Sequence, residues 1–118
     1  MTPDRLPLPL RSAVFGSAVA VLLWLTLAPS DELPQVSFWD KGEHALAFLV
    51  LAGLGLVLFP RHPVRMIVGV TALGALIEIL QATMDLGRDG DWRDLAADVV
   101  GVAAALLLFA LARRTLRR

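Results

Sequence analysis

Four predominantly apolar runs, separated by short charged connectors, make up most of this sequence and leave few folds open to it. An α-helix rises about 1.5 Å per residue, so these runs of 17 to 19 residues reach about 26–28 Å, close to the ~30 Å hydrocarbon core of a bilayer. The hydrophobic fraction is 57%, above the share of about 45–50% found in soluble domains. We therefore predict one all-α integral membrane domain over residues 1–118, a four-helix up-down-up-down bundle with spans at 12–28, 43–59, 66–84 and 95–112.

Composition excludes several classes of function. The chain has no cysteine, which removes disulfides, thiolate metal sites and cysteine catalysis. Its formal net charge is zero, so it offers no basic face for nucleic acid, and no nucleic-acid partner is expected.

The first apolar run has two interpretations. A cleaved signal peptide is one, since Arg5 and Arg11 precede the run. Residues 26–28 make a poor cleavage site and Pro29 follows them directly, so we favour a retained helix after an irregular tail at 1–11. Ser12, Gly16 and Ala20 recur every four residues, which predicts a smooth face for close helix packing.

The basic residues predict an orientation in the membrane. Cytoplasmic loops carry an excess of Lys and Arg. With a cytoplasmic N-terminus, eight arginines lie inside and three basic residues lie outside, so both termini are expected in the cytoplasm. The inner set is Arg5, Arg11, Arg61, Arg65, Arg113, Arg114, Arg117 and Arg118, and the outer set is Lys41, Arg88 and Arg93.

Most of the remaining polar residues fall at the outer ends of the last three helices, where alternating spans bring distant segments to one membrane depth. Within each helix these residues are spaced i, i+3 or i, i+4, so each group shares one face. Facing the bundle interior avoids a cost of up to ~3 kcal/mol for a lipid-exposed charge. We predict a polar pocket at the extracytoplasmic face formed by Asp40, Lys41, His44, Glu78, Gln81, Arg88, Asp91, Asp94 and Asp98.

Several of these residues have structural alternatives. Asp91 and Asp94 suit the N-terminus of the last helix, and capping is an equal alternative for Asp94. Glu78 and Gln81 also suit an interhelical hydrogen bond. Asp98 lies a full turn further in, so capping explains it poorly. Small residues continue the same two stripes and are expected to form packing faces: Thr71 and Gly74 on the third helix, and Gly101 and Ala105 on the fourth.

Three segments in order resemble the VanZ-like family of small bacterial membrane proteins: DKGEHALAF at 40–48, EILQ at 78–81 and GRDGDWRDLAADVVG at 87–101. The resemblance implies a multi-pass protein of the bacterial inner (cytoplasmic) membrane. The family's namesake is linked to teicoplanin resistance, which implies an effect on glycopeptide susceptibility. Asp98 departs from the family pattern, which usually has Asn there. The matching positions are Asp40, Lys41, His44, Glu78, Gln81, Arg88, Asp94 and Gly101.

Three functions fit this pocket. The first is binding or modification of a lipid-linked or envelope ligand, in which Lys41 and Arg88 hold a phosphate or carboxylate. The second is an intramembrane enzyme, with a divalent metal as optional cofactor and with His44 or Glu78 as general base. The third is a purely structural polar cluster. Membrane lipids or a lipid-linked envelope precursor are the expected partners, and a homo-oligomer is compatible with the sequence. A transporter is disfavoured because the inner halves of the spans lack polar residues.

Overall fold

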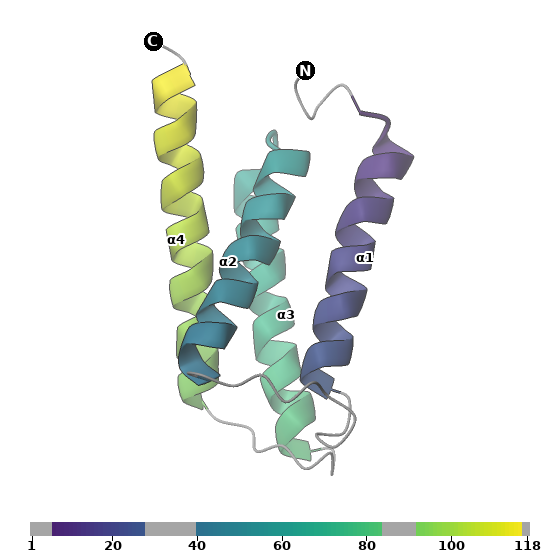
Figure 1. Ribbon diagram of the computed structural model, residues 1–118, viewed down its shortest axis with the longest axis vertical. Helices are drawn as coiled ribbons and strands as arrows, with labels where there is room; N and C mark the ends of the chain where they lie inside the picture. The colour runs from purple at the N-terminus through teal and green to yellow at the C-terminus, as the bar shows by residue number, and fades with distance from the viewer. Residues whose placement is uncertain (1–5, 28–39, 84–91, 117–118) are drawn as a thin grey trace.

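The computed structural model describes residues 6–27, 40–83 and 92–116, and of residues 40–43 it describes only the backbone. This part of the chain is all-helical, which confirms the predicted class and the predicted number of helices (Figure 1). The helices are α1 (Leu8–Leu27), α2 (Asp40–Leu58), α3 (Pro63–Thr83) and α4 (Trp92–Leu116).

All four helices begin three or four residues before the predicted spans, and prolines explain the differences at α1 and α3. α1 begins at Leu8, so the predicted tail at 1–11 is wrong for its last four residues. Pro9 lies in the first turn, where its missing N–H costs nothing, and the Pro7 carbonyl accepts hydrogen bonds from the next turn. α3 begins at Pro63, the position at which proline is favoured, instead of at residue 66.

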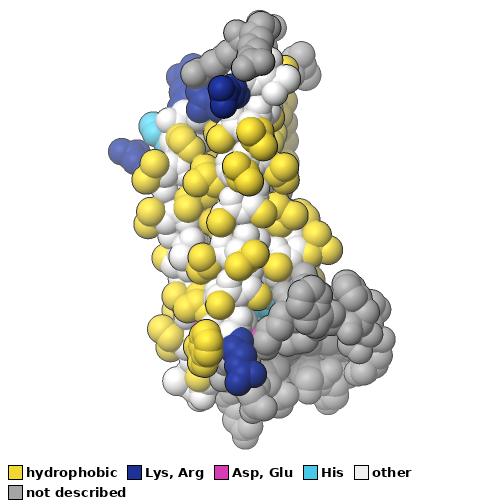
Figure 2. Space-filling model, turned by 90° about the vertical axis from the view of Figure 1, so that its left-hand side faces the viewer, with side chains coloured by type: hydrophobic (Ala, Val, Ile, Leu, Met, Phe, Trp, Pro, Cys, Tyr) yellow, Lys and Arg dark blue, Asp and Glu magenta, His cyan; other side chains and the backbone are white. Residues whose placement is uncertain are grey.

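The lengths of the helices suit a bilayer to different degrees. α1, α3 and α4 are long and apolar enough to cross a membrane, whereas the apolar stretch of α2, His44–Leu58, is shorter. α2 also carries much of the core, with Phe48, Leu51 and Leu56 all buried. Exposed hydrophobic side chains of all four helices, such as Val68 of α3 and Leu107 of α4, form a broad hydrophobic belt. Figure 2 shows one face of it. Such a surface fits a membrane protein.

Polar contacts near the helix ends join neighbouring helices. Arg11 Nη1 at the start of α1 donates to the Leu58 carbonyl at the end of α2, at 2.9 Å. Gln81 Nε2 near the end of α3 donates to the Thr26 carbonyl at the end of α1, at 2.7 Å. The second turns of α2 and α4 meet through His44 and Asp98, as described below. In Figure 1, α2 lies between α1 and α4.

The closest helix packing is between α2 and α4, and it depends on a glycine. A Cβ atom built on Gly101 would overlap the Ala45 carbonyl oxygen and lie 3.0 Å from the Leu49 nitrogen. Only a residue without a side chain lets the two backbones approach this far. Ala105, one turn further along α4, is also buried. The predicted packing face of α4 is thus confirmed.

The predicted packing face of α1 is wrong for the described part of the chain. Ser12, Gly16 and Ala20 are all exposed, and a Cβ atom on Gly16 would meet nothing within 4 Å. α1 buries only Leu22 and Thr26. Its regular spacing of small residues is not used for close packing because the residues that contact α2 and α3 lie on another face.

The Gly101 contact generates a stability prediction. Gly101→Ala forces the new methyl group into the Ala45 carbonyl, and we expect a loss of about 1–3 kcal/mol in the free energy of unfolding, typical of overpacking. Thermal unfolding in detergent, followed by tryptophan fluorescence, measures it. Gly16→Ala is the matched control, since its methyl group enters open space. Equal midpoints of thermal unfolding for Gly101→Ala and Gly16→Ala would contradict the close contact between Gly101 and Ala45.

Candidate functional site

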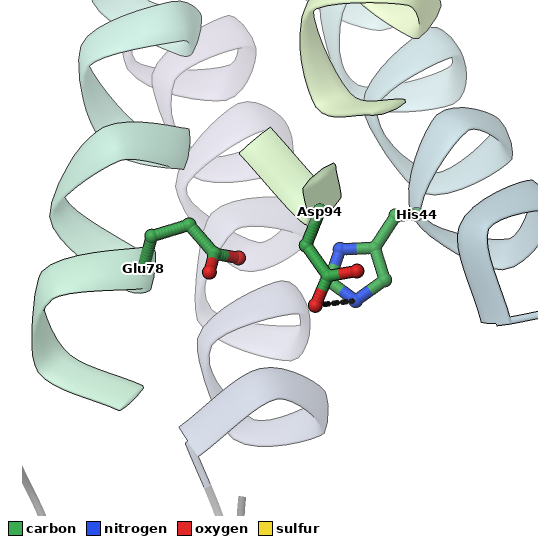
Figure 3. Close-up of side chains that lie close together, drawn as sticks. All are labelled: His44, Glu78 and Asp94. Atoms are coloured by element: carbon green, nitrogen blue, oxygen red, sulfur yellow. Dashed lines mark ion pairs between the residues drawn. The ribbon is translucent and has the colours of Figure 1, made fainter. Parts of the chain in front are cut away.

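Three polar side chains from three different helices converge at the end of the bundle where α2 and α4 begin. His44 comes from the second turn of α2, Glu78 from near the end of α3 and Asp94 from the first turn of α4. One side-chain nitrogen or oxygen of each lies within 4.8 Å of the others (Figure 3). We call these three residues the polar cluster. Glu78 and Asp94 are buried and His44 is largely buried, so the predicted inward orientation of both carboxylates is confirmed.

His44 lies between two aspartates of α4. Its Nδ1 is 3.1 Å from Asp98 Oδ1, a hydrogen bond, and its Nε2 is 3.7 Å from Asp94 Oδ2. Asp94 and Asp98 are one helical turn apart, so they reach the two nitrogens of one ring. Beside an ionised Asp98, which can only accept a hydrogen bond, the proton of a neutral His44 would lie on Nδ1.

The buried position of Asp98 depends on a second glycine. Asp98 is only 1% exposed. A Cβ atom on Gly74 would lie 3.2 Å from Asp98 Oδ2 and 3.2 Å from the ring of Phe48. Gly74, predicted to lie on a packing face, therefore makes room for both the carboxylate and the ring. Asp98 Oδ2 is buried and has no hydrogen-bond partner in the described part of the chain.

The polar cluster has the donor types of a divalent-metal site. One imidazole and two carboxylates make an oxygen-rich set that suits several divalent ions, including zinc and manganese. Two ligands of a tetrahedral ion lie about 3.4 Å apart for bonds of about 2.1 Å, so atoms within 4.8 Å need only small side-chain movements. Metal-bound histidines commonly donate their second N–H to a carboxylate, and Asp98 Oδ1 lies at hydrogen-bond distance from His44 Nδ1.

Gln81 makes an interhelical hydrogen bond, the structural alternative given for it in the sequence analysis. Its Nε2 donates to the Thr26 carbonyl, which joins α3 to α1. Thr26 lies in the last turn of α1, where carbonyls lack a donor within the helix. The Gln81 amide therefore supplies a donor to one of these carbonyls at a buried position. Sequence reasoning missed Thr26 because the contact uses its backbone, and its position in the last turn was the only available signal.

The other predicted residues stay predictions. Asp40 and Lys41 are the first two residues of α2, and their side chains lie outside the described part of the structure. Arg88 and Asp91 belong to 84–91, which also lies outside it. Trp92 at the start of α4 is highly exposed, as expected of an anchor at the membrane interface.

Comparisons with models of known protein families, with curated proteins and with solved structures find no match for this chain. The functional evidence for this chain is therefore the geometry of the polar cluster together with the three sequence segments at 40–48, 78–81 and 87–101.

The Gln81 contact generates the second prediction. Gln81→Met keeps the volume but removes the donor to Thr26, and we expect a loss of about 0.5–1.5 kcal/mol, the usual net contribution of one hydrogen bond. Hydrogen exchange should increase in residues 22–27. Affinity for divalent metal should not change, because Gln81 contacts α1. If the Gln81→Met variant instead showed unchanged hydrogen exchange and weaker metal binding, Gln81 would belong to the ligand-binding pocket.

Proposed function

We propose that the chain spans the bacterial cytoplasmic membrane four times in an up-down-up-down arrangement, with both termini in the cytoplasm. The charges of the described residues support this orientation. Most of the described arginines lie near one end of the molecule (Figure 2), namely Arg11, Arg61, Arg65, Arg113 and Arg114, whereas Arg93 lies at the other end. Excess basic residues favour the cytoplasmic side. The polar cluster then faces the outside, at the depth of lipid headgroups.

We further propose that the polar cluster binds a divalent cation and, through it, the phosphate of a lipid or lipid-linked envelope precursor. The observation that carries this proposal is the convergence of His44, Glu78 and Asp94 within 4.8 Å, with Asp98 behind the imidazole. Carboxylates and a neutral imidazole are good cation ligands, and their combined negative charge would repel an anionic headgroup without a cation between them. Lys41 and Arg88 would add cationic contacts to the same ligand.

The location of the polar cluster favours a headgroup over an acyl chain as the ligand. His44 lies in the second turn of α2, Asp94 lies in the first turn of α4, and Glu78 lies about a turn and a half from the end of α3. The neighbouring core is apolar, with Phe48 and Ile77 both buried. A polar ligand can therefore reach the polar cluster from the membrane surface without entering the hydrocarbon core. This proposal agrees with the VanZ-like sequence segments and with an effect on glycopeptide susceptibility.

Modification of the bound ligand is the second candidate, and the His44–Asp98 hydrogen bond favours it. A bound cation would polarise a phosphoryl or carbonyl oxygen and lower the pKa of a water molecule. An ionised Asp98 would keep the imidazole proton on Nδ1, and if the two carboxylates held the cation, the Nε2 of His44 would be available as general base. Glu78 would then hold the cation or accept a proton. A structural cluster that only fixes helix register is the remaining alternative.

Metal binding tests the first candidate. His44→Gln and Asp94→Asn each remove one metal ligand, and we expect the affinity for Zn²⁺ or Mn²⁺ to fall at least about 100-fold. Asp98→Asn should lower the affinity about 10–100-fold, because the His44 imidazole loses the carboxylate that orients it. Titration calorimetry in detergent, with elemental analysis after chelation and reloading, measures this. Ser17→Ala is the control, because Ser17 is exposed on α1 and bonds only to Ala13.

The outcomes separate the candidates. Retained affinity in folded His44→Gln and Asp94→Asn proteins would exclude the polar cluster as the cation site. A parent protein that binds no divalent cation, with variants that unfold at lower temperature, would favour the structural alternative. To test the envelope role, the susceptibility of an expressing bacterium to teicoplanin is compared for the parent and His44→Gln, at matched membrane levels. We expect the His44→Gln strain to lose the effect of the parent.

A further inference from the structure

An apolar groove lies at the opposite end of the molecule from the polar cluster. It runs between α1 and α3 beside the turn that joins α2 to α3, and its volume is about 460 Å³. Nearly all of its lining is hydrophobic. The side chains that form its walls are Phe15 and Val19 of α1, Phe59 of the turn, and Met66, Val70 and Leu73 of α3.

One end of this groove is cationic. Arg65 and His62 are part of its lining. A second, smaller pocket of about 260 Å³ adjoins it, because the two share Phe59 and His62. Arg11 and Arg61 line this second pocket. Three guanidinium groups therefore surround the point where the apolar groove reaches the end of the bundle.

The guanidinium of Arg11 is held in place but retains hydrogen-bonding capacity. Its Nη1 donates to the Leu58 carbonyl at 2.9 Å, and the group lies 5.2 Å from the centre of the Phe59 ring. Its Nε is buried and finds no acceptor among the described residues. A buried guanidinium donor without an acceptor is costly, and an anionic ligand would remove that cost.

Charge complementarity indicates the sign of the ligand. The acidic side chains that the structure describes, Glu78, Asp94 and Asp98, all lie at the other end of the bundle. The described residues around the cationic end therefore supply no counter-charge. A basic pocket between membrane helices, at the depth of the headgroups, typically binds anionic lipid.

We propose that this groove binds one anionic phospholipid, with an acyl chain along Phe15, Val70 and Leu73 and the phosphate among Arg11, Arg61 and Arg65. The groove opens onto the hydrophobic belt that faces the bilayer, so a chain can enter it sideways from the membrane. The cationic end supplies the headgroup selectivity that an ordinary lipid-facing surface lacks. This site is separate from the polar cluster and does not depend on its function or on the orientation of the protein in the membrane.

Gly69 allows the apolar part of the site to be tested separately. It belongs to the lining of the groove, and a Cβ atom there would meet nothing within 4 Å. A leucine at this position fills the space that the acyl chain would use while leaving the helix contacts intact. Gly16 is the matched control, because it is equally open but is not part of the lining.

The experiment is native mass spectrometry of the full chain released from bilayers of equal phosphatidylglycerol and phosphatidylcholine with identical acyl chains. We expect one phosphatidylglycerol to be retained in preference to phosphatidylcholine. Arg65→Gln should reduce this preference about five-fold, the equivalent of about 1 kcal/mol for one arginine near an anionic headgroup. Gly69→Leu should abolish retention of both lipids. Arg113→Gln and Gly16→Leu should behave as the parent protein does.

Two results would overturn the proposal. Equal retention of the two lipids by the parent would mean that the arginines do not recognise the headgroup. An equal loss of preference in Arg65→Gln and Arg113→Gln would assign the effect to the general charge of this end of the molecule. Each variant is first compared with the parent in thermal unfolding, and Arg61→Gln, which changes an exposed turn residue, replaces Arg65→Gln if that variant is unstable.

Discussion

The imidazole of His44, held between Asp94 and Asp98, links α2 to α4 at the point where their backbones approach most closely. Ala45, the next residue, faces Gly101, and this glycine contact brings the imidazole within 3.1 Å of Asp98. In a chain that contacts lipid, a carboxylate is tolerated only where another polar group meets it. The α2–α4 interface and the polar cluster therefore depend on each other, since each supplies the geometry that the other needs.

The two ends of the molecule carry opposite chemistry. The described carboxylates lie at the end where α2 and α4 begin, and most described arginines lie at the other end, beside an apolar groove. α1 is attached to the rest by little buried surface, with Leu22 and Thr26 as its buried residues. The hydrogen bonds of Arg11 and Gln81 hold its two ends. The same helix forms one wall of the groove, so its attachment also shapes the proposed lipid site.

Much of the fold and part of the candidate site could be predicted from the order of residues. Long apolar runs predict helices, and residues such as Glu78 and Asp98 predict an inward face because lipid exposure is costly. All four helices begin earlier than the predicted spans, and at Leu8 and Pro63 the reason is that proline suits the first turn of a helix. The regular spacing of Ser12, Gly16 and Ala20 predicts a packing face that α1 does not use, since spacing alone does not say which face a neighbour covers.

The sequence by itself determined the helical class, the apolar belt and the inward carboxylates, because helix period and the cost of charge in lipid act locally along the chain. Only the tertiary structure decided which partner each polar group meets. The sequence also allows Gln81 to join the polar cluster, but in the structure its amide donates to the Thr26 carbonyl near the end of α1. Asp98 orients His44 because Gly74 and Gly101 let three helices approach each other. Such pairings depend on distances between helices far apart in the chain, and no local pattern encodes those distances.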